Sequence, residues 1–109
     1  MSTFATVFSL YRERKRQLHE EGWTVEHDDL HTRDQLARAA AAYTLPPSNQ
    51  GRMQLWPWSI RFYKVVPDNR IRELEKAGAL LIAEIERLKR ERKNNGYSAR
   101  HYFGSDRSV

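Results

Sequence analysis

A long apolar repeat near the end of the chain is the feature that most constrains its fold. Apolar residues recur at steps of three and four over eighteen residues: Ile71, Leu74, Gly78, Leu81, Ile85 and Leu88. Such steps place side chains on one face of an α-helix. The repeat therefore predicts a long helix that begins after Pro67, with Asp68 or Asn69 as its N-cap. A glycine inside a helix costs about 1 kcal/mol against alanine, so Gly78 predicts a close helix crossing or space for a ligand.

Two further helices are predicted upstream. The first covers Thr3 to Glu21 and ends at Gly22, a residue type that commonly follows a helix. Its apolar stripe consists of Phe4, Val7, Phe8, Tyr11 and Leu18. The second helix opens at Thr32, because Thr32 and Gln35 have the spacing of a capping box. It is rich in alanine, which lets other helices approach closely, and it ends before Pro46.

The segment "MQLWPWSIRFYKVVP" between the second and third helices is aromatic and β-branched. It predicts a short strand or an extended arm, since Pro57 opposes a helix there. The expected fold is mainly α, a small single-domain arrangement of three helices with this aromatic extended segment. Residues 1–93 form the helical domain and residues 94–109 a basic, aromatic tail that we expect to dock on another surface.

The composition indicates a thin core. Of the 109 residues, 39% are hydrophobic and 30% are charged, whereas apolar residues usually make up about 45–50% of a globular domain. We therefore expect a homo-oligomer that shares an interface through its first and third helices. The chain has no cysteine, which excludes disulfides and thiolate metal sites. No apolar run approaches the ~18 residues that span a membrane, so we expect a soluble, cytoplasmic protein without a membrane partner.

The net charge of +5 belongs to the end of the chain. Residues 87–109 hold seven basic and two acidic residues, a net of +5, so residues 1–86 balance to zero. This distribution indicates a local basic extension rather than a nucleic-acid surface over the whole fold. Binding of nucleic acid through the tail is an alternative that the sequence does not favour.

The stretch "GWTVEHDDLHTRDQ" raises two chemical alternatives. His27 and His31 stand four apart, as two zinc ligands on one helix would. The predicted capping box, however, leaves both histidines in the loop before the helix, and no third ligand has a recognisable spacing. Asp28 and Asp29 are adjacent, so they point different ways in an extended chain and do not easily share a proton. These patterns favour neither a metal centre nor an acid–base pair.

Aromatic and cationic residues together favour a binding site for a nucleotide-like ligand. Aromatic faces stack on bases, and Arg or Lys pairs with phosphate. The flat faces come from Trp23, Tyr43, Trp56, Trp58, Phe62 and Tyr63. The nearby cations are Arg33, Arg61, Lys64 and Arg70. The alternative is that these aromatic residues only cover a small core, as aromatic side chains usually do.

Three stretches carry a resemblance to a known family: "EGWTVEHDDLHTRDQLARAAAAYTLP", "LWPW" and "KAGALLIAEIERLKR". Between Arg12 and about Arg90 the chain resembles a family of small phage and prophage proteins, most of them without a known function. The resemblance implies that the signature positions include Gly22, Trp23, His27, Asp28, His31, Leu36, Ala39, Ala40, Tyr43, Trp56, Pro57, Trp58, Lys64, Ala77 and Gly78.

Over about half of its length the chain is also similar to the ryanodine-receptor repeat domain. The shared order consists of Gly22-Trp23, Asp28-Asp29, His31, Tyr43 and Leu45-Pro46. This similarity implies a small helical ligand-binding module rather than an enzyme.

Together these features predict a non-enzymatic phage-type protein, without cofactor or metal, that sequesters a nucleotide-derived immune signal. The signal would be a cyclic nucleotide or a cyclic ADP-ribose-like molecule, and the protein a counter-defence sponge. In this hypothesis a base stacks on Trp23, Tyr43, Trp56 or Trp58. Phosphate is held by Arg33, Lys64 and Arg70. The loop is ordered by His27, Asp28 and His31, which also contact ribose or base edges.

Two other functions remain open at this point. One is a metal-dependent nucleotide hydrolase or pyrophosphatase that uses Asp28, Asp29 and the histidines. The other is an inhibitor that binds a host defence protein or nucleic acid through the basic tail.

Overall fold

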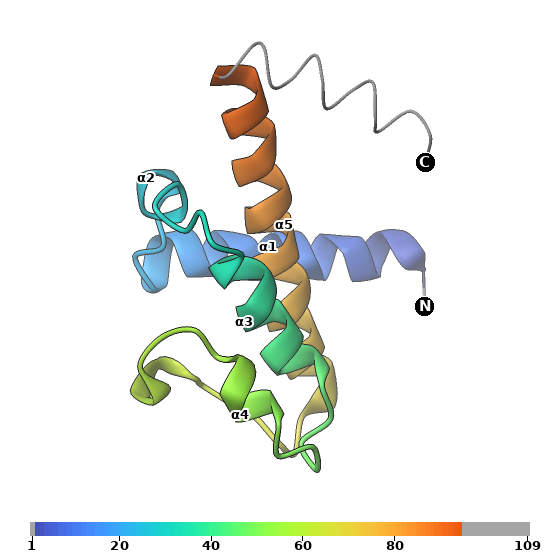
Figure 1. Ribbon diagram of the computed structural model, residues 1–109. Coiled ribbons are helices and arrows are strands. Elements are labelled where there is room, and N and C mark those ends of the chain that lie inside the picture. The colour runs from blue at the N-terminus through green and yellow to red at the C-terminus, as the bar shows by residue number, and fades with distance from the viewer. Residues whose placement is uncertain (1, 95–109) are drawn as a thin grey trace, which may run out of the picture.

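The helix predicted from the apolar repeat runs through the whole molecule (Figure 1). The computed structural model describes residues 2–94, and α5 covers Arg70–Asn94. The predicted cap is confirmed, because Asn69 Oδ1 accepts a hydrogen bond from the backbone N–H of Arg72 at 3.1 Å. α1 (Thr3–Glu20) crosses α5, and α3 (Gln35–Thr44) lies along its first half. The mainly helical, single-domain fold class is confirmed, whereas the predicted tail from residue 95 onward lies outside the described residues.

The ends of α1 follow from local hydrogen bonds. At its start, Ser2 Oγ accepts from the N–H of Ala5 at 3.0 Å. Past its end, Gly22 has φ +71°, a left-handed conformation that glycine adopts without steric cost. The N–H of Trp23 then donates to the carbonyl of Gln17 at 3.1 Å. The predicted helix end at Gly22 is confirmed, and the turn sends the chain toward a short helix.

The start predicted for the second helix is wrong. The connector contains a helical turn, α2 (Val25–Asp28), capped by Thr24, whose Oγ1 accepts from the N–H of His27 at 3.1 Å. α3 begins only at Gln35, because Asp34 before it has φ 62°, a left-handed conformation that interrupts any helix from Thr32. A short polar side chain tolerates this conformation.

Alanines bring α3 and α5 close together, as their abundance predicts. Ala39 and Ala42 of α3 are fully buried, and so is Ala83 of α5. With so few side-chain atoms between the helices, aromatic rings cover the ends of this contact. The core cluster consists of Leu36, Ala39, Ala40, Ala42, Tyr43, Trp56, Tyr63, Ala77, Leu80 and Ala83.

Of the two alternatives predicted for the aromatic segment, the short strand does not form: the described residues 2–94 contain no strand. The aromatic segment instead forms α4 (Arg52–Leu55) and a 3₁₀ turn, η1 (Ile60–Phe62). Between them the chain folds back, and the indole N–H of Trp56 donates to the carbonyl of Ser59 at 2.9 Å. A strand needs a second strand to pair with, and the described chain around this segment is helical.

A buried ion pair joins this segment to α5. Glu73 is fully buried, and its Oε2 lies 2.7 Å from Arg52 Nη2. Arg52 Nε also donates to the hydroxyl of Tyr63 at 2.8 Å, and that hydroxyl donates to the carbonyl of Ala42 at 2.6 Å. The N–H of Val66 supplies a further bond to Glu73 at 2.9 Å. The carboxylate therefore holds α4, the end of the aromatic segment and α5 in one arrangement.

α1 buries polar residues and exposes apolar ones. Glu13, Arg14 and Gln17 are its buried side chains, and Glu13 Oε1 lies 2.6 Å from Arg72 Nη2 on α5. The crossing is close, since a Cβ at Gly78 would stand 2.7 Å from a methyl carbon of Leu10. The close crossing predicted at Gly78 is confirmed, but most of both predicted apolar stripes face away from the core.

Glu73→Gln should destabilise the protein by about 3 kcal/mol, because it leaves the buried Arg52 without its countercharge. Urea unfolding followed by circular dichroism measures this loss. Glu20→Gln is the matched control, since Glu20 Oε2 lies 3.5 Å from Arg16 with its side chain 66% exposed, and an exposed pair contributes about 0–1 kcal/mol. If both variants lost the same free energy of unfolding, the buried pair would contribute no more to stability than an exposed one, which would contradict the prediction.

Candidate ligand-binding site

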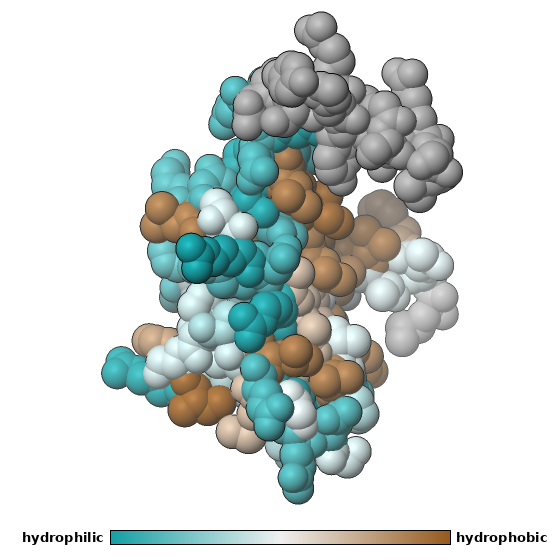
Figure 2. All heavy atoms as spheres, viewed as in Figure 1, coloured by the Kyte–Doolittle hydropathy of each residue, from teal (hydrophilic) through white to brown (hydrophobic). Residues whose placement is uncertain are grey.

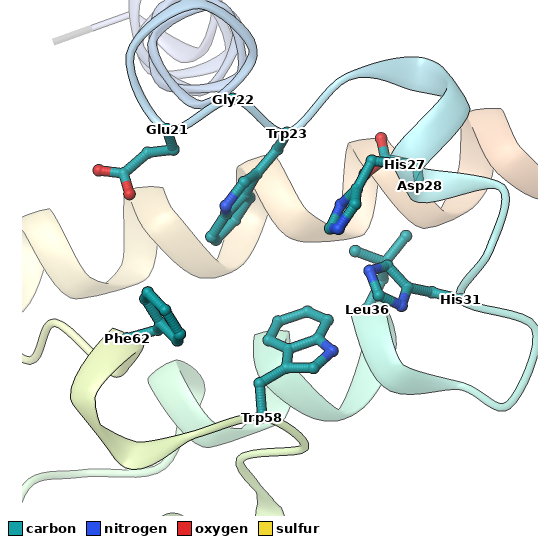
Figure 3. A pocket seen from close by; sticks show the side chains of 9 residues that line it. All are labelled: Glu21, Gly22, Trp23, His27, Asp28, His31, Leu36, Trp58 and Phe62. Atoms are coloured by element: carbon teal, nitrogen blue, oxygen red, sulfur yellow. The ribbon is translucent and has the colours of Figure 1, made fainter.

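A cavity opens between the end of α1, α2 and the aromatic segment (Figure 3). Its volume is about 320 Å³, at the lower end of the ~300–1,000 Å³ that small-molecule sites occupy. The lining residues are Glu21, Gly22, Trp23, His27, Asp28, His31, Leu36, Trp58 and Phe62. Segments that are far apart in the sequence thus contribute to a single site.

Aromatic rings form the apolar walls of the cavity. The rings of Trp23, Trp58 and Phe62 border the same space from different sides (Figure 3). The centroids of Trp23 and Trp58 are 6.1 Å apart, with their planes tilted by 55°. Behind Trp58, the ring of Trp56 follows at 5.2 Å and that of Tyr63 at a further 4.7 Å. Ring contacts therefore run from the cavity into the core, which supports the position of Trp58.

Two imidazoles close one end of the cavity. The rings of His27 and His31 meet edge to face with centroids 4.9 Å apart, and His31 lies at the same distance from Trp58. Burial, together with the neighbouring charge of His27, lowers the pKa of His31 below its ordinary 6.5. The site therefore favours a neutral His31, which can both donate and accept a hydrogen bond.

The two carboxyl groups of the site differ in their surroundings. Asp28 is buried, with Oδ2 2.7 Å from Arg14 Nη2. Burial raises the pKa of Asp28, although the bond and charge of Arg14 oppose that rise. For Glu21, burial would also raise the pKa, but hydrogen bonds from Lys64 and Arg16 outweigh it and lower the pKa. Glu21 thus brings an ionised carboxylate to the cavity edge, paired on its outer side with Lys64 and Arg16, and no lysine or arginine is among the residues that line this part of the described chain.

The structure brings together half of the residues predicted for the site. Those that line the cavity are Trp23, His27, Asp28, His31 and Trp58. Tyr43 and Trp56 instead belong to the buried core. The Tyr43 hydroxyl accepts from the N–H of Lys64 at 3.0 Å, and burial raises its pKa to about 12. These two aromatics therefore support the site from behind and do not face it.

The three predicted phosphate-binding cations lie elsewhere. Lys64 Nζ donates to both carboxylate oxygens of Glu21 at 3.0 Å, beside the cavity. Arg70 hydrogen-bonds the carbonyls of Tyr43, Thr44 and Leu45, where it closes the end of α3. The side chain of Arg33 is exposed and does not line the cavity. Of the three, Lys64 is the one positioned beside a lining residue.

The site is completed by Glu21, Gly22, Leu36 and Phe62, which the sequence did not predict as ligand contacts. Phe62 stood among the aromatic faces, but nothing in the sequence separated it from the core aromatics. Glu21 was interpreted only as the end of the first helix. Its proximity to the cavity depends on the left-handed turn at Gly22, and glycine at a helix end was the only signal of that turn.

The described residues do not gather into a metal site. Within residues 2–94, no three histidine, aspartate or glutamate side chains are grouped so that they could hold a metal ion. The rings of His27 and His31 contact each other, His31 also contacts Trp58, and Asp28 is paired with Arg14. The geometry therefore offers no observation in favour of the hydrolase alternative.

Comparisons with known proteins leave the family open: no family model, no curated protein and no solved structure matches the chain. In residues 2–94, no helix combines the length and apolar character needed to cross a membrane. What the protein does must therefore be inferred from the geometry and chemistry of the cavity.

The pKa of His31, measured by NMR titration, should lie below 6.5, and His27→Gln should raise it because a neighbouring positive charge is removed. Since the folded protein holds this proton less tightly than the unfolded chain, His31 costs stability as the pH falls through 6.5. Glu26→Gln, an exposed neighbour on α2, serves as the control. A pKa at or above 6.5 would contradict the burial of His31 against Trp58.

Proposed function

We propose that this protein is a non-enzymatic binding protein whose cavity holds the base of a nucleotide-derived small molecule. The observation that carries the proposal is the placement of Trp23, Trp58 and Phe62 around one cavity. Stacking on an aromatic side chain contributes about 1–3 kcal/mol per base. Two indoles and a phenyl ring around one space therefore supply the main attraction for a flat heterocycle.

The polar groups of the cavity suit the donor groups of a base and a ribose. The Glu21 carboxylate accepts hydrogen bonds from amino or hydroxyl groups, and His31 offers one donor and one acceptor when it is neutral. A negative charge beside aromatic rings also attracts a positively charged ring. A phosphate inside the cavity would meet no lysine or arginine among the described lining residues, so the base and ribose occupy the cavity and the phosphates lie outside it, where Lys64 pairs with Glu21.

Lys64 is the cation best placed for such an external phosphate. Its side chain is 54% exposed, and its ammonium group already lies against Glu21. A phosphate at the rim would bond the exposed side of that ammonium group, while Glu21 remains available to the base or ribose. This division differs from the sequence hypothesis, in which Arg33 and Arg70 also held phosphate.

The proposed role is sequestration of a signalling molecule. In the phage context that the sequence resemblance suggests, sequestration would be a counter-defence function, in which the protein lowers the concentration of a host immune signal by binding it. Asp28, the carboxyl group nearest to the histidines in sequence, is buried against Arg14 and positions α2. This arrangement supports holding a ligand rather than cleaving one.

Calorimetry against cyclic di- and trinucleotides and cyclic ADP-ribose isomers should detect binding of at least one compound. Trp58→Ala should weaken that binding by about 1–3 kcal/mol, or roughly 5–150-fold, because one stacking surface is lost. Met53→Ala is the matched control, since Met53 is exposed on α4 and outside the cavity. The control should bind as the unaltered protein does.

Two results would contradict the proposal. Flat calorimetric traces for every compound would remove the proposed ligand class, and equal weakening by Met53→Ala would remove the assignment to this cavity. Chromatography of the ligand recovered after denaturation separates binding from hydrolysis. A binding protein returns the ligand intact, whereas a cleaved product would favour the hydrolase alternative.

A further inference from the structure

Two helices expose an apolar surface that the described domain does not use. Of the fifteen large apolar side chains exposed in residues 2–94, nine lie on α1 and α5. We call them the crossed-helix face: Phe4, Val7, Phe8 and Tyr11 on α1, and Ile71, Leu74, Leu81, Ile85 and Leu88 on α5. In Figure 2, hydrophobic side chains gather along α5 and beyond it toward the N-terminal half of α1. The surface joins two helices and is more than a scatter of single residues.

The N-terminal half of α1 extends away from the rest of the domain as an arm. α1 crosses α5 where Leu10 meets Gly78, and the N-terminal half of α1 projects beyond that crossing (Figure 1). Phe4 is 77% exposed there. Within the described residues, the ring contacts of this half join members of the same stripe, with Phe4 to Phe8 at 6.4 Å and Phe8 to Tyr11 at 5.9 Å. Within residues 2–94, the exposed aromatic residues of this half therefore contact rings of their own helix.

The exposed area matches what an oligomer needs. With about 150–200 Å² for a fully exposed side chain of this size, the nine residues expose roughly 700–1,000 Å². The largest apolar patch of a typical monomer covers about 300–600 Å². A stable protein–protein interface buries about 800 Å² on each partner. The crossed-helix face therefore exceeds an ordinary monomer surface and has the size of one side of a dimer interface.

We propose that a second copy of this chain covers the crossed-helix face, with the α1 stripe of each copy on the α5 stripe of the other. The α1 stripe from Phe4 to Tyr11 spans seven residue steps, or about 10 Å along a helix, the same length as the Leu81–Leu88 part of the longer α5 stripe. A twofold axis makes both contacts at once, because each copy carries one arm and one α5. The thin alanine core is consistent with this arrangement, since most of the large apolar side chains of α1 and α5 lie on this face, whereas Leu80 lies in the core.

This inference is independent of the proposed ligand. Sedimentation equilibrium of the full 109-residue chain should give at least twice the monomer mass of 12.9 kDa. Phe8→Lys and Ile85→Lys should each weaken association by at least about tenfold, because each places a charge in a buried apolar contact. Leu30→Lys is the matched control, since Leu30 is 72% exposed and lies on neither helix.

Circular dichroism should show unchanged helix content in these variants, because the substituted side chains point away from the core. If Phe8→Lys or Ile85→Lys unfolds the chain, Phe4→Lys and Ile71→Lys replace them, at positions 77% and 69% exposed. A monomer mass at every concentration would overturn the proposal, as would weakening by only one helix's variants or equal weakening by Leu30→Lys. A monomer that dimerises only when residues 95–109 are removed would also overturn it, since the tail would then cover the face.

Discussion

The buried contact between Glu73 and Arg52 is the interaction on which the rest of the structure depends. Glu73 lies on α5, Arg52 begins α4, and Tyr63 joins them through a bond of 2.8 Å to Arg52. Five of the ten residues in the apolar core around them are alanines, which each bury little surface. Ring contacts of Trp56 and Tyr63 with Tyr43 join the aromatic segment to this core. The ion pair and its hydrogen bonds add a directional constraint, because a displaced segment would leave a buried charge unpaired.

A second buried ion pair fixes the position of α2 on the other side of the cavity. Arg14 of α1 meets Asp28 of α2 at 2.7 Å, and both side chains are buried. One pair thus positions Trp58 and Phe62 through the aromatic segment, and the other positions the histidines through α2. The left-handed turn at Gly22 places Trp23 between them. The two buried ion pairs thus fix the segments that carry the cavity walls, although only Asp28 among their members lines the cavity itself.

The regular helices could be predicted from the sequence, but the loops between them could not. The apolar repeat predicted α5, and glycine and proline predicted the ends of α1 and α3. The repeat did not show that its large residues face outward. Side-chain periodicity identifies one face of a helix, and here the opposite face is buried through alanines, Glu73 and Arg87. The capping box at Thr32 predicted the wrong start for the second helix, because Asp34 adopts a left-handed conformation that the residue types do not indicate.

Only part of the site could be predicted, because some of its residues are close in sequence and others reach it through loops. Residues 23–31 are close in sequence, so their common cavity followed from one dense stretch of the chain. Trp58 and Phe62 reach that cavity only because the segment folds back around Pro57, whereas the sequence predicted a short strand or an extended arm there. Trp56 and Trp58 are separated by one residue, yet the first is core and the second lines the cavity. Which of the two indoles enters the core depends on long-range ion pairs such as Arg52 to Glu73, which fix the position of the segment. The partners of such a pair are far apart in the sequence, so the sequence alone does not reveal it.

The most direct test follows the three indole N–H signals by two-dimensional NMR while the full chain is titrated with the cyclic nucleotides and cyclic ADP-ribose isomers. A ligand in the cavity should shift the signals of Trp23 and Trp58, because both rings line it. The signal of Trp56 should stay in place, since its indole N–H is bonded to Ser59 within the core. A shift that is largest for Trp56, or no shift of any indole signal with any of these compounds, would contradict the assignment of the binding site.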